Sequence, residues 1–484
     1  MITADWSLPA LVMLPLLAGL GCFLAPGAAR TTGIVASVAL LLLTTRLAYE
    51  VLLDGVLDQH VGNWAPPLGI ALRLDGVGAT MLLMTATVAT AISVYAARYY
   101  PAPAARGFWP LWLFLLASMA ALFLSRDLFN LYVTLELLGI AAVALTALGG
   151  GATALAAAAR YLLASLVGSL CYLLGVALTY HACGSVDLAV VGEHFGQTRS
   201  AASTAALALM TTGLLLKGAL FPLHFWLPAA HSSASAPVSA ALSALVVKGA
   251  FFILLRLWLE AFAPVDPAYF AALSVLGAAA IIWGSLLALL QRRAKLLIAY
   301  STVAQLGYLF LALPLVHDDP GAWAAIILLA ASHGFAKAAM FLAAGNLQSF
   351  AGHDRVAELN RVVRRMPVTI AAIGIAGVSI MGLPPSGGFN GKWMLLQSAA
   401  AQGRWGIAGV LLIGGLLAGA YLFKLIEQAF TPGDDEGEAG RISGSREWSA
   451  FGLALIALLL GFVTMPWLAV TNAGGALAAG GGAG

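Results

Sequence analysis

The chain is poor in charge. Of its 484 residues only 9% are Asp, Glu, Lys or Arg, whereas 61% are hydrophobic. Water-soluble domains carry about 25% charged residues, so this composition excludes an ordinary soluble protein. The apolar residues form long runs between short polar breaks, and a run of about 20 such residues crosses a bilayer as a helix. The sequence therefore predicts an all-α polytopic membrane protein with about 14 transmembrane helices.

Cysteine is also scarce. Cys22, Cys171 and Cys183 are scattered rather than spaced as a metal or disulfide framework, and no histidine pair has an obvious haem-binding arrangement. The net charge of +3 comes without a basic cluster interleaved with aromatic residues, which argues against nucleic-acid binding. We therefore expect no cofactor, no metal and no nucleic acid, and we expect any coupled redox chemistry to belong to another protein.

The loop charges indicate an orientation. The first apolar run, 8–25, follows no basic residue and is interpreted as a first helix rather than a signal peptide. With the N-terminus placed outside, most Lys and Arg residues of the predicted loops fall on one side, Arg292, Arg293, Lys295 and Arg446 among them. Basic loops stay in the cytoplasm. We expect a multi-pass protein of the bacterial cytoplasmic (inner) membrane with both termini outside.

Several basic residues fall inside predicted spans. They are Lys217, Lys248, Arg256, Lys337, Lys392 and Lys424. A charge at the centre of a membrane helix costs about 2.5–3.5 kcal/mol on insertion scales, so such a residue marks a functional pathway with a partner nearby. Arg256 and Lys424 lie close to span ends, where reaching to the interface is an equal alternative. The other lysines are candidate proton carriers.

One acidic residue lies deep in a predicted span. Glu136, in LFNLYVTLELLGIAAVAL, is predicted to pair with Lys217. Such a pair holds both groups ionised, and separating them weakens the hold of the lysine on its proton. The alternative is an ordinary helix glutamate that is hydrogen-bonded to a serine or a carbonyl.

Two spans contain helix-breaking residues. Pro222 follows Lys217 in GALFPLHFWLP, and Pro384 and Pro385 precede Lys392 in IMGLPPSGGFNGKWML. Proline removes a backbone donor, and interruptions at membrane depth are tolerated where they line a water-filled cavity. The alternative is two plain kinks. The sequence predicts broken helices seventh and twelfth in the chain.

The matching positions of the two breaks predict two inverted five-helix repeats, as in secondary transporters. The expected division is 1–109 for the first three helices, 110–262 for the first repeat, 263–430 for the second repeat, and 431–484 for a solvated loop, a last helix near 449–470 and a flexible tail.

Histidines accompany the lysines. His333 and Lys337 are four residues apart and share one helix face, so with Lys248 and Lys392 they are predicted to form a polar line in the membrane. The alternative for His333 is a satisfied buried histidine. His224 and His231 lie at the predicted cytoplasmic end of the broken seventh helix. They either admit protons there or cap the loop.

These segments together resemble a known family. FNLYVTLELL, LLLKGALFPLHFWLPAAHSSASAPVSA, VVKGAFFILLRL, SHGFAKAAMFLAAGNL and GLPPSGGFNGKWMLL, in this order, look like the proton-translocating antiporter-like subunits. That family includes subunits of Mrp-type sodium/proton antiporters, respiratory complex I and membrane-bound hydrogenases. The resemblance covers roughly residues 70–430. It implies a core of 14 helices and a carrier order that starts at the Glu136–Lys217 pair and continues through Lys248, His333 and Lys337 to Lys392.

The wording FNLYV and the chain length resemble the D type of Mrp antiporter subunits most. The resemblance implies a transporter subunit that is no enzyme by itself, works with other integral membrane subunits, and moves protons, with sodium as a candidate second ion. One alternative is the pump module of a complex I-like NADH dehydrogenase, a hydrogenase or a carbon-uptake complex. Another is a stand-alone carrier of a small anion bound between Lys217 and Lys392. Several lysines on successive helices favour a relay over a single binding site.

Overall fold

The computed structural model describes residues 6–60, 64, 69–197, 200–359, 362–431, 442–475 and 477. The loop at 432–441 and the tail from 478 onward, which the sequence predicts as solvated and flexible, lie outside these residues.

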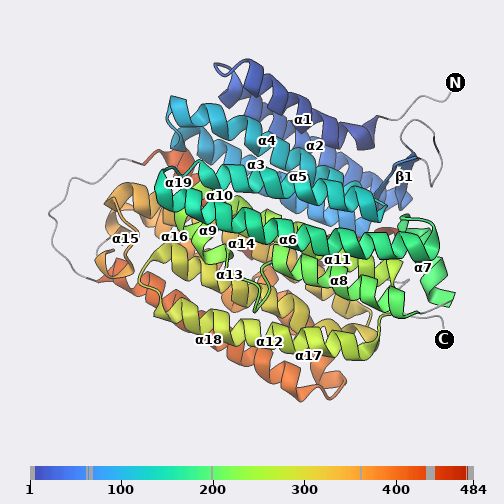
Figure 1. Ribbon diagram of the computed structural model, residues 1–484. Helices are drawn as coiled ribbons and strands as arrows, with labels where there is room; N and C mark the ends of the chain where they lie inside the picture. Colours follow the sequence, from blue (N-terminus) through green and yellow to red (C-terminus); the bar gives the residue numbers. More distant parts are fainter. Residues whose placement is uncertain are drawn as a thin grey trace.

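The described chain is a bundle of long apolar helices (Figure 1). Eleven of them are long and apolar enough to cross a bilayer. They are α1 (Ser7–Leu24), α2 (Ala29–Asp54), α3 (Gly76–Tyr99), α4 (Ala102–Leu124), α5 (Leu128–Ala147), α6 (Gly151–Cys183), the continuous segment from α10 (Ala236–Ala241) through α11 (Val247–Arg256) to Ala261, α12 (Pro267–Leu290), α13 (Ala294–Leu311) with its 3-10 extension, α14 (Gly321–Ala351) and α18 (Trp405–Phe430). The expected helical membrane fold is confirmed.

Both predicted helix breaks are present. The first separates α8 (Ala201–Lys217) from the short α9 (Leu227–Ser233), and the second separates α16 (Pro367–Met381) from α17 (Gly387–Ala401). These halves are individually too short to be counted with the eleven long spans. The total of 14 spans and the inverted repeats therefore stay predictions.

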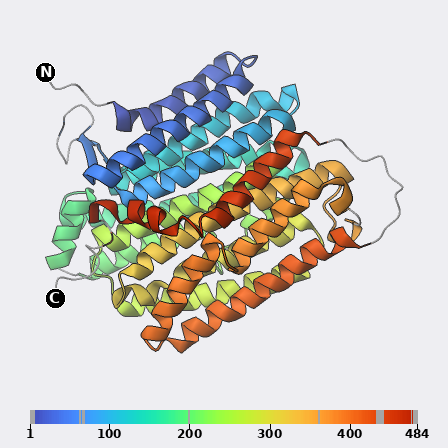
Figure 2. The ribbon, with the colours of Figure 1, turned by 180° about the vertical axis from the view of Figure 1, so that it is seen from behind.

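The last span differs from the expectation. A single helix near 449–470 is wrong, because α19 (Gly444–Leu459) and α20 (Thr464–Asn472) meet at an angle of 81° (Figure 2). The bend brings Gly461 against the second break, where a Cβ would lie 1.8 Å from the Pro385 carbonyl oxygen. The Asn390 amide donates to the Gly461 carbonyl over 2.8 Å. This hydrogen bond gives the Gly461 carbonyl a partner at the bend, where the regular hydrogen bonds of the helix are interrupted.

Two small features at one end of the bundle were not predicted. β1 (Leu57–His60) and β2 (Ala71–Leu74) form an antiparallel pair in which Leu57 lies opposite Leu74. The short helix α7 (Leu188–Gln197) packs against the π-helical end of the α10–α11 segment, Leu257–Ala261. The start of α1 and the end of α20 lie at this same end (Figures 1 and 2).

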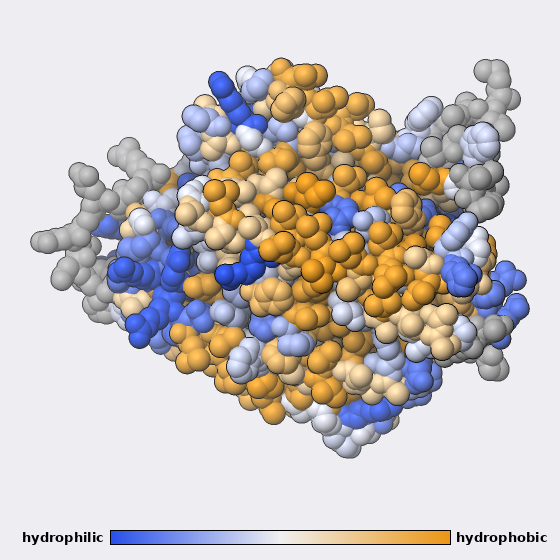
Figure 3. Space-filling view, viewed as in Figure 1, coloured by the Kyte–Doolittle hydropathy of each residue, from blue (hydrophilic) through white to orange (hydrophobic). Residues whose placement is uncertain are grey.

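The centre of the bundle is formed by α14 and the α10–α11 segment, whose apolar stretches are entirely buried, whereas only 28% of the apolar stretch of α1 and 33% of that of α18 is buried. The face of the molecule seen in Figure 3 is largely hydrophobic between two more hydrophilic ends. A soluble protein rarely exposes so large an apolar area, and a bilayer or neighbouring membrane subunits would cover it. The central helices are the ones that carry the candidate site.

Candidate functional site

The first break positions Lys217. It is the last residue of α8, and a basic residue is favoured in the last turn of a helix. Its Nζ is 3.2 Å from Glu136 Oε1 on α5. The Lys217 side chain is buried and that of Glu136 is 17% exposed. The predicted pair is therefore a direct ion pair near the edge of the bundle.

Glycines bring the helix of Lys217 close to its neighbour. A Cβ on Gly213 of α8 would lie 2.2 Å from the Gly168 carbonyl oxygen of α6, so only glycine fits there. Small residues allow such close approach of membrane helices. A cavity of about 10 Å³ beside Lys217 is also lined by Val246 and Ala250, close in the chain to the next lysine. It has room for about one water molecule.

Lys248 lies in the buried centre. Its Nζ is 2.6 Å from His333 Nδ1 on α14, and it donates to the Ser243 carbonyl, also over 2.6 Å. Ser243 belongs to a π-helical turn, Leu242–Val246, and such turns interrupt the regular helix ladder. Among the described residues His333 Nε2 has no hydrogen-bond partner. Lys248 and His333, which lie on different helices, are therefore within hydrogen-bond distance of each other.

Lys337 is one helical turn beyond His333 on α14 and is fully buried. Its ammonium contacts the Ser301 hydroxyl and donates to the Ile298 carbonyl over 3.2 Å, both on α13. These two partners of the Lys337 ammonium are neutral oxygen atoms.

The second break positions Lys392. The Lys392 Nζ donates to the carbonyls of Ile380 and Met381 over 2.8 and 3.2 Å. These are the last residues of α16, whose carbonyls have no partner within a helix that ends there. The Tyr308 ring of α13 lies 4.2 Å from the ammonium, and the Ser386 hydroxyl accepts from the Phe389 amide to start α17. The break itself therefore supplies the acceptors of this lysine.

The other two predicted histidines flank the first break. His224 lies in the turn between α8 and α9 and stacks on Phe221. His231 lies in α9, is fully buried and stacks on Phe341 with ring centroids 4.6 Å apart. Within the described residues neither ring nitrogen of His231 has a hydrogen-bond partner. His231 thus does not cap the loop by a hydrogen bond to described residues.

The structure joins the predicted residues in two direct contacts, Glu136–Lys217 and Lys248–His333. Lys337 and Lys392 are held by oxygen atoms of neighbouring helices instead. Together the residues form a series on α5, α8, α11, α14 and α17. Such a series of ionisable side chains in the membrane interior is suited to proton transfer.

Sequence reasoning missed a second buried charge cluster. Arg256 is buried in the protein: it donates to both carboxylate oxygens of Asp75 over 2.5 and 2.8 Å and to Glu260 over 2.7 Å. Asp75, which is fully buried, also caps α3 by accepting from the Gly78 amide. Asp75, which precedes α3, is thus more deeply buried than Glu136, and the Asp–Gly start of α3 was the available signal.

Two basic residues expected in cytoplasmic loops are buried. Lys295 is 2% exposed and its ammonium donates to the Ala234 carbonyl at the end of α9. Arg446 in α19 donates to the Tyr95 hydroxyl over 3.0 Å and to Ser349 over 2.8 Å. Both residues lie in the first turn of a helix rather than in a loop. Their side chains are buried because they pack against other helices.

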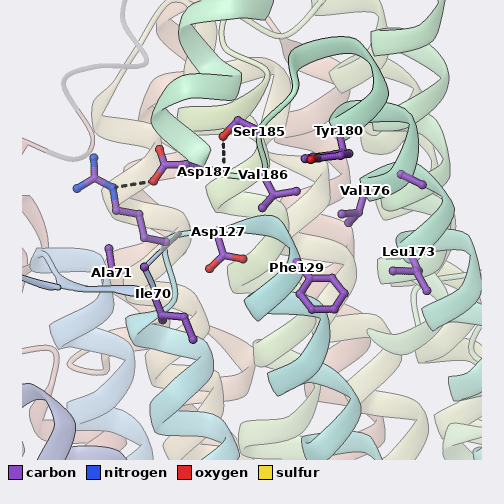
Figure 4. A pocket seen from close by; sticks show the side chains of 13 residues that line it. Ile70, Ala71, Asp127, Phe129, Leu173, Val176, Tyr180, Ser185, Val186 and Asp187 are labelled. Carbon is purple, nitrogen blue, oxygen red and sulfur yellow. Dashed lines mark hydrogen bonds and ion pairs between the residues drawn. The ribbon is translucent and has the colours of Figure 1, made fainter. Parts of the chain in front are cut away.

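The larger surface pockets lie elsewhere. One of about 430 Å³ is lined by Asp127, Phe129 and Asp187 at the N-terminal end of α5 (Figure 4). It contains none of the predicted carriers. Among the described residues no group of three His, Cys, Asp or Glu side chains is arranged to hold a metal ion.

The two broken helices, each with a lysine beside its break, agree with the resemblance to the antiporter-like subunits. Residues 125–418 match the family described as NADH:quinone oxidoreductase/Mrp antiporter, transmembrane. The chain belongs to this family, as its motifs predicted.

Its relatives include both branches of the family. The N-type subunit of the NADH-quinone oxidoreductase of Desulforudis audaxviator is 35% identical over 416 residues, which cover 83% of this chain and 82% of that protein. The D-type subunit of the Na(+)/H(+) antiporter of Alkalihalophilus pseudofirmus is 29% identical over 444 residues, 89% of this chain and 88% of that one.

Solved structures agree on the fold. A chain of the Mrp complex from Dietzia sp. DQ12-45-1b superposes with a TM-score of 0.91 at 24% identity, covering 99% of this chain and 97% of that one. A chain of respiratory complex I from Thermus thermophilus gives a TM-score of 0.76 at 26% identity, covering 96% and 98%. The multi-pass antiporter-like fold is thereby confirmed.

Proposed function

We propose that the chain is the proton-translocating subunit of a multi-subunit membrane complex. The observation that carries this proposal is the series of buried ionisable side chains on successive helices, beginning at the Lys217–Glu136 ion pair. In this scheme separating the pair releases the Lys217 proton, and Lys248, His333, Lys337 and Lys392 pass protons onward. His224 and His231 are the candidate uptake groups.

The complex we favour is an Mrp-type cation/proton antiporter of the bacterial inner membrane. The likeness to the D-type subunit of a Na(+)/H(+) antiporter over 89% of the chain supports this choice. The chain would then be a transporter subunit without catalytic activity of its own, bound by lipid and other integral subunits, with sodium as a candidate for the exchanged ion. Residues 110–262 and 263–430 would be its inverted repeats, after 1–109 and before 431–484.

A second candidate is the pump module of a complex I-like enzyme. The 35% identity to an N-type subunit of NADH-quinone oxidoreductase favours it. Both candidates use the same buried series and differ in the partner that drives it.

Proton movement tests the shared mechanism. Everted membrane vesicles that contain the complete complex are assayed with a pH-sensitive dye for the variants Glu136→Gln and Lys217→Met. We expect each to abolish proton movement while the protein stays in the membrane, since each removes one member of the ion pair. Arg46→Met, which removes a mostly exposed ion pair on α2, is the control. Normal activity in both pair variants would overturn the proposal.

Co-purification distinguishes the two complexes. The tagged chain is isolated from its native membrane in mild detergent, and its companions are identified by mass spectrometry. Small membrane subunits without redox proteins support the antiporter, whereas iron–sulfur, flavin or hydrogenase subunits support the pump module. A chain that purifies alone would contradict both.

A further inference from the structure

Helix α13 carries a polar stripe through the centre of the bundle. Lys295, Ser301, Thr302 and Gln305 are all buried and follow one another at intervals that keep them near one helix face. Each contacts a different segment: Lys295 the Ala234 carbonyl, Ser301 the Lys337 ammonium, Thr302 the Ser243 hydroxyl and Gln305 the Ile380 carbonyl. None of the last three was singled out from the sequence.

The stripe spans the interval between the last two lysines. Lys337 is on α14 and Lys392 on α17, and no hydrogen bond between them occurs in the described residues. Ser301, which contacts Lys337, is one turn before Gln305. The Gln305 amide donates over 3.3 Å to the Ile380 carbonyl, and Lys392 donates to that same oxygen over 2.8 Å.

We propose that Gln305 is a positioning residue for proton transfer between Lys337 and Lys392, because it holds the carbonyl that Lys392 uses as its acceptor. This inference rests on the proposed function. A helix C-terminal carbonyl in an apolar interior is costly without a donor. Gln305 keeps the Ile380 carbonyl hydrogen-bonded when the Lys392 ammonium moves away, so Lys392 is free to release and regain its proton.

The position of Tyr308 supports this role for α13. It follows Gln305 by three residues, and its ring lies 4.2 Å from the Lys392 ammonium. α13 therefore contacts the Lys392 site twice, once through the shared carbonyl and once through an aromatic face that attracts cations. The same helix contacts Lys337 through Ser301, one turn before Gln305. α13 therefore contacts both Lys337 and Lys392.

The test compares two replacements of Gln305 in the complete complex. Gln305→Met keeps the length of the side chain but removes the amide donor, and we expect proton movement to fall by about tenfold, the effect of losing one buried hydrogen bond. Gln305→His restores an N–H donor, and we expect it to recover most of the activity. A purely structural role would lower the thermal unfolding midpoint and the amount of protein in Gln305→Met, whereas a positioning role lowers proton movement at an unchanged protein level and midpoint.

Gln402→Met is the matched control. The Gln402 amide donates to the Leu315 carbonyl over 2.9 Å, the same type of bond away from the lysines. We expect proton movement in this variant to stay near wild type. Normal activity in Gln305→Met would overturn the inference, as would equal losses in Gln305→Met and Gln305→His. If Glu136→Gln abolishes movement while Gln305→Met does not, the proposed function stands and only this inference fails.

Discussion

At the scale of single residues, the buried cations are held in two different ways. Lys217 has a carboxylate partner, Glu136, at 3.2 Å. Lys337 and Lys392 instead donate to carbonyl oxygens. A charged partner stabilises only the protonated lysine, whereas neutral oxygens hydrogen-bond to a lysine in either state. The pair is therefore suited to switching, and the carbonyl-bound lysines are suited to passing protons on.

The Asp75–Arg256 contact predicts a large effect on stability. Asp75→Asn leaves the buried Arg256 guanidinium with Glu260 as its remaining carboxylate partner, so the cost is below the roughly 3–5 kcal/mol of a fully unpaired buried charge. The thermal unfolding midpoint in detergent should fall clearly, and the double variant with Arg256→Met should lose less than the two single losses combined. Arg46→Met removes an exposed pair worth about 0–1 kcal/mol and serves as control. An unchanged midpoint in Asp75→Asn would contradict this account.

The sequence alone indicated most residues of the candidate site, because a lysine inside a membrane span is costly and usually has a functional role. The partners were less accessible. Arg256 and Asp75 are 181 residues apart, and Lys295 meets a carbonyl 61 residues away. Ser301 and Gln305 look like ordinary polar residues of a membrane helix. Only tertiary packing shows which of these face the lysines.

At the scale of elements, helix ends do much of the positioning. Lys217 ends α8, and Lys392 binds the end of α16. The carbonyls at the end of α16 accept hydrogen bonds from the Lys392 ammonium, and a cation beside a helix C-terminus is favourable. Proline and glycine patterns predicted these breaks. The 81° bend before α20 was not predicted, although Gly461 lies in the bend and Pro466 in the first turn of α20.

The close contact of α6 and α8 gives an element-scale prediction. Gly213→Val places side-chain atoms where the Gly168 carbonyl already lies, since even a Cβ would be 2.2 Å from it. The helices must separate, and we expect lower thermal stability and a strong loss of proton movement as Lys217 is displaced. Gly409→Val, where nothing lies within 4 Å, should behave as wild type. If both variants behave alike, close packing does not position Lys217.

At the scale of the whole molecule, the long apolar runs predicted the helical membrane class, because the length of a span follows the thickness of the bilayer.

The charges of the loops predict how the chain is oriented in the membrane. Trp6 and Arg355 lie in segments expected outside and inside, and both are exposed. In a variant lacking the three native cysteines, an impermeant maleimide should label Trp6→Cys in intact cells and Arg355→Cys only after disruption. The reverse pattern would mean the opposite orientation.

In the proposed function, protons cross the membrane along the series of buried ionisable side chains. Lys248, which is fully buried against His333, lies in the middle of this series. The most direct test is proton movement in vesicles that carry the complete complex with Lys248→Met. Lys424→Met is the control, since Lys424 binds the carbonyls of Leu289 and Gln291 at the end of α12. We predict no proton movement in Lys248→Met and near-normal movement in Lys424→Met. Normal movement in Lys248→Met, with the protein present at wild-type level, would contradict the account.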